Sequence, residues 1–389
     1  MRAFGRCHGV VRLPDQQQPD KLMNYKLKAA PTAISQEQNS QKEPKANRID
    51  IGVDAHLKSY QAARKIDNGT VGVVQSYGSK EALLLYALKQ REQAKEVRVV
   101  YEAGPLGFRL YRDLEAEGIK CLVCAPRSDQ QKRKRRKNNT IDARTLTGEL
   151  SNYLNGNEQA LQLVRVPTEA QEQARIESRQ HDALVKERKR IGAIGNSLLL
   201  SQGYSSWSNW WRPKAFERLS QAVAGWIVKH LGRWVGILRE LDQQIAQAKV
   251  ELGQQWKGPR PKGMGAPSLA QLNAEVLDWN RYSNRRKIGC LAGMVPSEWS
   301  TGEGQRLGAI TKVGVPAIRR ILTEMVWRMI LFQPQYKAIQ KWREVLKGSN
   351  RGLKKKAVVA IGRQLIVDIW RLQTGRITAQ ELGLIMIEG

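Results

Sequence analysis

The sequence predicts an α/β domain with a mixed sheet, followed by a helical coiled-coil region and a mostly helical C-terminal domain. Three observations predict this order. Short β-rich runs alternate with helical spacing up to about residue 160, a heptad repeat follows, and amphipathic helices fill the rest of the chain. Of the 389 residues, 41% are hydrophobic and 26% charged, which is typical of a folded protein with two or three domains.

Residues 1–47 are rich in Gln, Lys, Pro, Ser and Asn and show no sustained periodicity, so we expect a disordered extension. The α/β domain is expected over 48–160. Its β-rich runs come first as a hairpin-like group and then alternate with helices, which indicates a mixed sheet. These runs are 49–54 with its continuation to 63, 71–77, 97–101 and 119–125, and the helical runs are 80–92 and 106–117.

Four cysteines are too few and too scattered for a disulfide framework. Cys121 and Cys124 form a CxxC pair, but the apolar run around them reads as a buried strand whose period of two directs them to opposite faces. Because no second Cys/His pair lies at ligand spacing, we do not expect a zinc site there.

The helical region is expected over 168–257. Thr168 and Gln171 form a capping box that predicts a helix to about residue 200. The tryptophans that follow, at 207, 210 and 211, either stack on unpaired bases or form a core, and we favour the core. A heptad seam then follows, and it fits an intrachain hairpin and a dimer contact equally well. Its members are Leu231, Trp234, Leu238, Leu241, Ile245, Ala248 and Leu252.

The Gly- and Pro-rich stretch 258–267 marks a boundary, and the C-terminal domain is expected over 258–389. No stretch approaches about 18 consecutive apolar residues, and the N-terminus lacks the apolar core of a signal peptide. We therefore expect a cytoplasmic protein with no membrane partner.

The charge balance predicts a nucleic-acid partner. The chain carries 65 Lys and Arg against 36 Asp and Glu, a formal net charge of +29, which phosphate backbones would screen. Residues 127–137 hold seven cations and one Asp, and we expect this segment to follow phosphates and not merely to form a solvated face. The candidate phosphate contacts are Lys132, Arg133, Lys134, Arg135, Arg136 and Lys137, and, in the helix after Thr168, Arg175, Arg179, Lys186, Arg188, Lys189 and Arg190.

Three carboxylates suggest a metal site. Asp54 ends one β-rich run, Glu102 ends another at a turn, and Asp142 lies on the helix after the basic segment. Mg²⁺ or Mn²⁺ ions that assist phosphoryl transfer need oxygen ligands from separate elements. His56 follows Asp54 by two residues and shares its face of the strand, where we expect it to support the site or the fold without binding the metal.

Five stretches carry a resemblance to a known family. IGVDAHLKSY, VVYEAGPLGFRLYRDL, NNTIDARTLTGEL, LAGMVPSEWSTGEGQRLGAITKVG and AIRRILTEMVW occur in this order between about residues 48 and 375. They resemble insertion-sequence transposases of the one-ten family, which are DEDD recombinases related to pilin-gene invertases. The resemblance implies an RNase H-like (RuvC-like) N-terminal domain, a coiled-coil middle, a C-terminal transposase domain that supplies a serine, and a structured bridge RNA that pairs with donor and target DNA.

By position, Asp54, Glu102 and Asp142 match the first, second and fourth acidic residues of the family pattern. The third is Asn139, whose amide oxygen can coordinate a metal but carries no charge. An inactive copy, a substitution that traps a substrate complex, and coordination by Asp142 with water remain open explanations. The family serine falls at Thr301, beside Ser300, and we expect Ser300 to be the nucleophile with Thr301 as the alternative. A purely structural turn is the third reading of this pair.

The leading hypothesis is therefore an RNA-guided DNA recombinase that forms a covalent protein–DNA link and works as a homodimer or tetramer. A nucleic-acid-binding relative without activity and a stand-alone RuvC-like nuclease are the alternatives. Metal-dependent strand transfer would separate the recombinase from the inactive relative, and a protein–DNA adduct would separate it from the nuclease.

Overall fold

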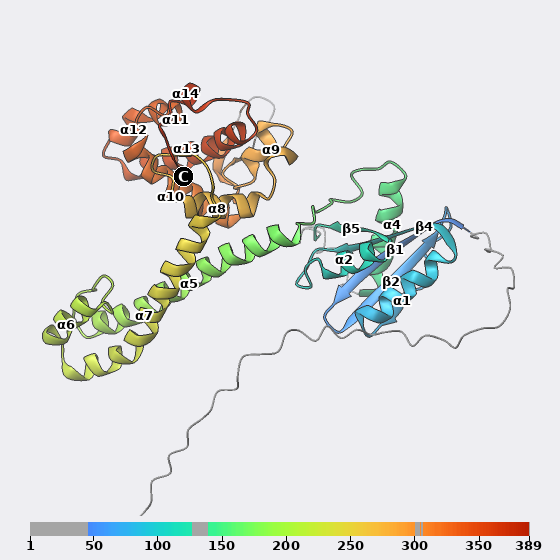
Figure 1. Ribbon diagram of the computed structural model, residues 1–389, viewed down its shortest axis with the longest axis horizontal. Coiled ribbons are helices and arrows are strands. Elements are labelled where there is room, and N and C mark those ends of the chain that lie inside the picture. Colours follow the sequence, from blue (N-terminus) through green and yellow to red (C-terminus); the bar gives the residue numbers. More distant parts are fainter. Residues whose placement is uncertain (1–45, 127–138, 300–303, 305, 389) are drawn as a thin grey trace, which may run out of the picture. The chain divides into compact units, whose positions relative to one another are not determined.

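The computed structural model describes residues 46–126, 139–299, 304 and 306–388, and the chain divides into two compact units between Val164 and Arg165 (Figure 1). The expected extension 1–47 lies outside the described residues except for its last two. Ala46 and Asn47 already belong to the first strand, which begins two residues earlier than the composition indicated.

The N-terminal unit is built on a five-stranded mixed sheet, as the sequence predicts. Its strand order is β3-β2-β1-β4-β5, with β1 antiparallel to β2, β2 antiparallel to β3, and the pairs β1–β4 and β4–β5 parallel. This arrangement is compatible with an RNase H-like fold. The strands are β1 (Ala46–His56), β2 (Ser59–Ile66), β3 (Gln75–Tyr77), β4 (Ala94–Glu102) and β5 (Lys120–Cys124).

The predicted strand over 71–77 is correct only for its last three residues. The chain from residue 71 to residue 74 has no regular structure, and Val73 is almost fully exposed, so this part has no buried face to pack against the sheet. The alternation of apolar and polar residues alone therefore overestimated the length of this strand. In β5, by contrast, Cys121 and Cys124 are both buried as expected, and burial raises the pKa of the Cys121 thiol.

Among the described residues of this unit, three helices accompany the sheet: α1 (Lys80–Arg91), α2 (Arg109–Ala116) and α4 (Asn139–Leu154). Ser79 caps α1 by accepting a hydrogen bond from the Ala82 amide. Helix α2 starts later than the predicted residue 106, because Gly107 adopts a positive φ of 63° in the turn before it. Helix α4 packs on β1, β2 and β4.

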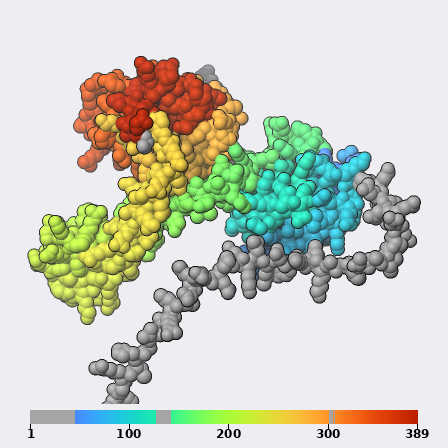
Figure 2. Space-filling model, viewed as in Figure 1, coloured from blue at the N-terminus to red at the C-terminus, as the bar shows by residue number. Residues whose placement is uncertain are grey.

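The second unit begins with a helical hairpin made of α5 (Glu169–Ser201), α6 (Pro213–Ala222) and α7 (Gly225–Gln254). The capping box of Thr168 and Gln171 is present, so the predicted helix start is confirmed. Trp210 is fully buried and Trp211 nearly so, which confirms the core interpretation of these two residues. They belong to the apolar core of the hairpin, whose outer surface the space-filling view shows in yellow-green (Figure 2).

The heptad positions of α7 pack against other helices of the same chain. Leu231, Leu238, Ile245 and Leu252 are buried, and α7 packs along α5 and α8. The other seam positions, 234, 241 and 248, are half-buried. This packing corresponds to the hairpin interpretation, whereas the expected dimer or tetramer stays a prediction.

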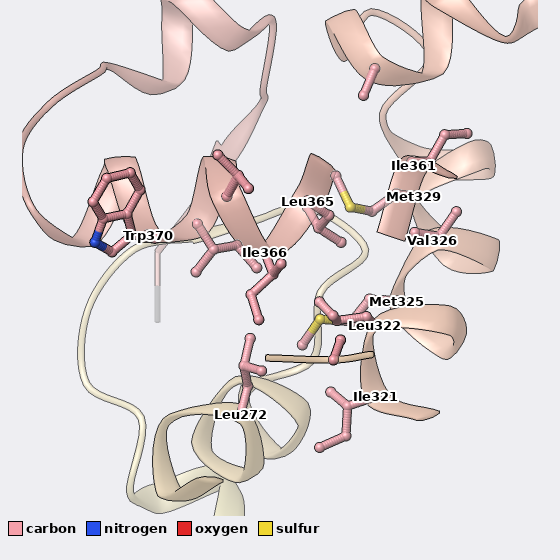
Figure 3. Packing of buried hydrophobic residues seen from close by; sticks show 14 of the residues in the cluster. Leu272, Ile321, Leu322, Met325, Val326, Met329, Ile361, Leu365, Ile366 and Trp370 are labelled. Atoms are coloured by element: carbon pink, nitrogen blue, oxygen red, sulfur yellow. The ribbon is translucent and has the colours of Figure 1, made fainter. Parts of the chain in front are cut away.

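The remaining elements surround one apolar core (Figure 3). Leu322, Met325 and Met329 of α10 pack with Ile361 and Leu365 of α13 at its centre. The helices are α8 (Ala266–Val276), a 3₁₀ turn (Trp279–Arg281), α9 (Arg285–Cys290), α10 (Pro316–Phe332), α11 (Lys337–Lys341), α12 (Arg343–Lys347), α13 (Arg351–Gln373) and α14 (Ala379–Leu382).

Two short strand pairs complete this unit. Strand β7 (Pro296–Glu298) pairs with β8 (Leu307–Ile310), and β6 (Arg260–Pro261) pairs with β9 (Met386–Ile387). The buried side chain of Gln333 joins the second pair by donating to the carbonyls of Lys262 and Ile385, at 2.9 and 2.8 Å. The start and the end of this helical domain are thus bonded to each other. In the part of the chain that the structure describes, no helix is long and apolar enough to cross a membrane.

Candidate functional site

Asp54 and Glu102 lie at the same edge of the sheet. Val53 of β1 is paired with Tyr101 of β4 in the parallel ladder, and each carboxylate is the next residue along its strand. Both strands run in the same direction, so their carboxyl ends meet there. The register therefore places these two predicted site residues on neighbouring strands.

Helix α4 crosses the sheet two residues before Asp54. Gly52 approaches this helix so closely that a Cβ at residue 52 would lie 2.4 Å from the Thr147 amide nitrogen and 2.6 Å from the Ala143 carbonyl oxygen. The Thr147 hydroxyl accepts a hydrogen bond from the Gly52 amide at 3.0 Å. Because Gly52 and Asp54 point to the same face of β1, Asp54 lies on the face that α4 covers. Asp142 precedes Ala143 on that helix.

Glu102 lies on the same face. Val100 packs with Leu146 and Leu150 of α4 in a small core, and side chains two residues apart on a strand share a face. Asp54 and Glu102 thus share one face at one edge of the sheet, and Asp142 lies on the helix that covers this face.

The three carboxylates supply the oxygen ligands that Mg²⁺ and Mn²⁺ prefer, so the donor chemistry fits the predicted metal. Over the described ranges 46–126, 139–299, 304 and 306–388, however, no three His, Cys, Asp or Glu side chains are close enough to form a ready-made metal site. The candidate ligands thus come from three elements, and their side chains are not clustered.

His56 contacts Asp54 directly. Its Nε2 lies 3.1 Å from the Asp54 Oδ2, and its side chain is about half exposed. His56 and Asp54, which were predicted to share one face of the strand, are thus in polar contact. An imidazole at this distance can orient the carboxylate, and the supporting role expected for His56 stays a prediction.

The helix α4 begins at Asn139, and the structure describes its backbone there but not its side chain. Ser300 and Thr301 lie outside the described residues, and so does the basic segment with Lys132, Arg133, Lys134, Arg135, Arg136 and Lys137. The hairpin of β7 and β8 flanks the two hydroxyl residues. On it, the exposed Trp299 ring lies over Gly308, where a Cβ would be 2.9 Å from the ring.

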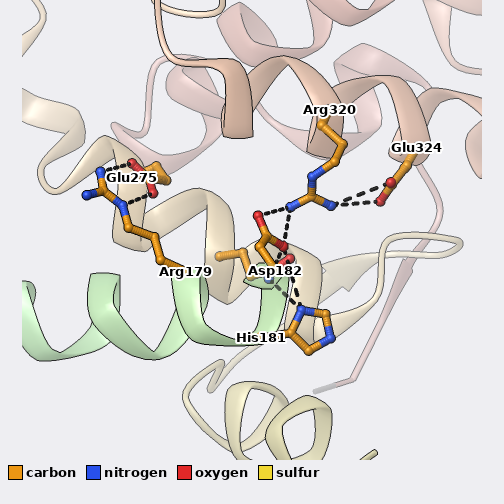
Figure 4. Close-up of polar contacts among 7 residues, drawn as sticks. Arg179, His181, Asp182, Glu275, Arg320 and Glu324 are labelled. Atoms are coloured by element: carbon orange, nitrogen blue, oxygen red, sulfur yellow. Dashed lines mark hydrogen bonds and ion pairs between the residues drawn. The ribbon is translucent and has the colours of Figure 1, made fainter. Parts of the chain in front are cut away.

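The predicted phosphate-contacting residues of α5 fall into two groups. Arg179 donates to both Glu275 oxygens at 3.2 and 3.4 Å, and Arg188 donates to Asp242 at 2.9 Å (Figure 4 shows the first pair). Arg175 also lies 3.8 Å from Glu275, and burial lowers the pKa of its guanidinium. Lys186, Lys189 and Arg190 are exposed, and Arg190 pairs with Glu187 on the same helix.

A second polar cluster joins α5 to α10. Arg320 donates to both carboxylate oxygens of Asp182 at 2.6 and 2.5 Å, and it also contacts Glu324 of its own helix (Figure 4). Burial alone would favour the neutral acid, but the His181 and Arg320 side chains hold the pKa of Asp182 below its ordinary value. These ion pairs fix the position of α5 against the C-terminal helices.

Sequence reasoning missed Gly52 and Thr147, which hold the site together. The signal available was a glycine at the centre of a buried strand, since such a glycine often marks a close backbone approach. It also missed Arg320 and Glu275, whose partners lie 138 and 96 residues away along the chain.

The mixed sheet and the positions of the three carboxylates are compatible with an RNase H-like nuclease or transposase. Comparison with known proteins narrows the class of protein to one family. The sequence profile of the transposase IS116/IS110/IS902 family matches residues 260–341. A Sinorhizobium fredii protein named "Putative transposase y4rJ" is 31% identical over 320 residues, covering 73% of this chain and 80% of that protein. A second protein of this organism, "Putative transposase y4qE", is 26% identical over 302 residues, covering 71% and 70%.

The chain therefore belongs to the IS116/IS110/IS902 transposase family, and the resemblance stated from its motifs is confirmed. Family membership makes it a transposase with DNA as its substrate.

Proposed function

We propose that this transposase cuts and exchanges strands of donor and target DNA through a covalent protein–DNA bond, guided by a structured noncoding RNA. One observation carries the proposal: Asp54 and Glu102 share one face at one edge of the sheet, and Asp142 lies on the helix that covers this face. A phosphoryl-transfer site needs oxygen ligands that come from separate elements.

Asp54, Glu102 and Asp142 would hold Mg²⁺ or Mn²⁺, with the Asn139 amide oxygen as a neutral fourth group. When bound, the metal polarises the phosphate and stabilises the charge that develops on it. His56 orients the Asp54 carboxylate through their 3.1 Å contact.

The hydroxyl of Ser300, or of Thr301, supplies the nucleophile. Its oxygen forms a bond to the phosphorus as the bond from phosphorus to one sugar oxygen breaks. The hydroxyl proton passes to water, and the released sugar oxygen takes up a proton from water. The resulting phosphoester conserves the bond for joining to a second strand, as covalent catalysis does elsewhere. A homodimer or tetramer would hold two DNA sites at once.

The test is a protein–DNA adduct that survives denaturation. We expect the adduct with labelled duplex DNA and the RNA that copurifies with the protein, and we expect Ser300→Ala to abolish it. If the adduct remains in Ser300→Ala, it should disappear in Thr301→Ala. Cleavage without an adduct at any time point would instead identify a stand-alone nuclease, and an adduct in the double variant would exclude both hydroxyls.

Asn139 offers a second test. Asn139→Asp places a charged oxygen at the start of α4, so we expect more adduct at limiting Mg²⁺, since affinity for the ion rises with the number of charged ligands. A magnesium titration of both forms measures this. Identical curves would show that residue 139 is not a ligand, and an inactive natural form with an active Asp variant would support the inactive-copy explanation.

A further inference from the structure

A groove of about 480 Å³ lies between α5 and α7 near the tip of the helical hairpin. Ile194 and Leu198 of α5 form one wall, and Trp226, His230, Arg233 and Trp234 of α7 form the other. The volume falls within the range of roughly 300–1,000 Å³ that is typical of small-ligand sites. The metal site and the hydroxyl residues are not part of it.

Trp226 is 50% exposed, and Leu231 of the hairpin core lines the groove beside it. Its ring lies 6.0 Å from that of His230, at an angle of 81°. Nearby, the indole nitrogens of Trp210 and Trp211 donate to Gly192 and Asp242, so those rings serve packing. Trp226 therefore lines the groove with an aromatic side chain that is half exposed.

The charge of the groove narrows the choice of ligand. Arg233 is exposed at its edge, and none of the described residues that line the groove carries a carboxylate. Over residues 201–240 the sequence has six Lys and Arg against two Glu. A second copy of the chain would bring this face against itself in a two-fold contact, placing like charges together. An anionic ligand with flat rings suits the groove better.

We propose that this groove binds an unpaired base of an RNA, with the base stacked on Trp226 and the adjacent phosphate held by Arg233. Base–aromatic stacking with flanking cations is the general way in which proteins bind single strands. Loops and bulges of RNA present unstacked bases, whereas a base of duplex DNA must first leave the helix at a cost of a few kcal/mol. The inference rests on the proposed role of a structured RNA, but it concerns binding and not strand exchange.

The experiment measures the affinity of the full-length protein for a short single-stranded oligoadenylate RNA. We expect Trp226→Ala to weaken binding about tenfold, since stacking on one aromatic ring contributes about 1–3 kcal/mol. Trp226→Phe should retain most of the affinity. Trp327→Ala is the matched control, because Trp327 of α10 is 45% exposed and lies outside the groove, and it should leave binding unchanged. Arg233→Gln should reduce the log–log salt slope by about 0.7.

Three further measurements can overturn the proposal. An abasic RNA of the same length should bind the natural protein and Trp226→Ala equally, so an equal loss on abasic and base-containing RNA would exclude stacking. An equal loss of affinity in Trp226→Ala for duplex DNA and for single-stranded RNA would exclude selection of an unpaired base. A change in sedimentation without a change in affinity would show that the groove is a contact between copies. If Trp226→Ala fails to fold, the affinities of Trp226→Phe and Arg233→Gln for the same RNAs still test the proposal. A missing protein–DNA adduct would refute the recombinase without affecting these binding results.

Discussion

Two helices of this protein are held in place by opposite means. Helix α4 lies directly on the sheet at Gly52, where the contact is neutral: Thr147 is bonded to the Gly52 amide, and there is no space for a side chain at residue 52. Helix α5 is joined to α8 and α10 by ion pairs, Arg179 with Glu275 and Arg320 with Asp182. The first contact depends on shape and the second on charge. We therefore expect the two regions to respond differently to substitution, pH and salt.

The largest effect should come from Gly52→Ala. The added Cβ would lie 2.4 Å from the backbone of α4, so the helix must move away, at a cost of about 3 kcal/mol. Hydrogen exchange of the β1 amides measures this loss in the N-terminal unit alone. Gly148→Ala on the same helix is the control, because nothing lies within 4 Å of its Cβ, and it should stabilise α4 by about 0.5–1 kcal/mol. Equal behaviour of the two variants would contradict the close approach.

A smaller effect, with a pH dependence, should come from Asp182→Asn. Because the folded pKa of Asp182 lies below its ordinary value of 3.8, its ionised form contributes stability above that pH, and this contribution is lost as the pH falls through the lowered pKa. We expect the variant to be about 1–2 kcal/mol less stable at neutral pH. Denaturation of both proteins at several pH values should show the difference closing below about pH 4. A difference that does not change with pH would mean that the ion pair with Arg320 contributes nothing.

The smallest effects separate the paired and the exposed cations of α5. Lys189→Gln should lower the log–log slope of duplex affinity against salt by about 0.9, if this lysine contacts one phosphate. Arg179→Gln should change the slope less, because Glu275 already neutralises this guanidinium. Replacing Arg133, Lys134, Arg135 and Arg136 by Ala together should flatten the slope most within this series. An unchanged slope in the fourfold variant would refute the assignment of the basic segment to phosphates.

The sequence predicts well what is local. Period-two alternation found β1 and β4, and the capping box found the first residue of α5, because each depends on neighbours a few positions away. The three carboxylates could be placed at strand ends and on a helix by the same reasoning. That Asp54 and Glu102 lie on adjacent parallel strands follows only from the strand order.

What depends on distant contacts could not be predicted. The cations of α5 look alike in the sequence, yet Arg179 and Arg188 are paired with carboxylates 96 and 54 residues away, and Lys189 is exposed. Gly52 gives no indication of how near α4 will come, since that distance is set by residues about 90 positions later. Which cations are paired, and which glycines are closely approached, is therefore determined only by the folded chain.

The pairing of β6 with β9 has a practical meaning for fragments of this protein. The family profile ends at residue 341, but α13 fills the centre of the core and the last strand is bonded through Gln333 to the beginning of the domain. A fragment expressed over the profile limits alone would expose the apolar faces of α8 and α10 to water and would be prone to aggregate. The region that the family profile matches is thus shorter than the domain that folds. A stable C-terminal fragment has to continue through residue 387.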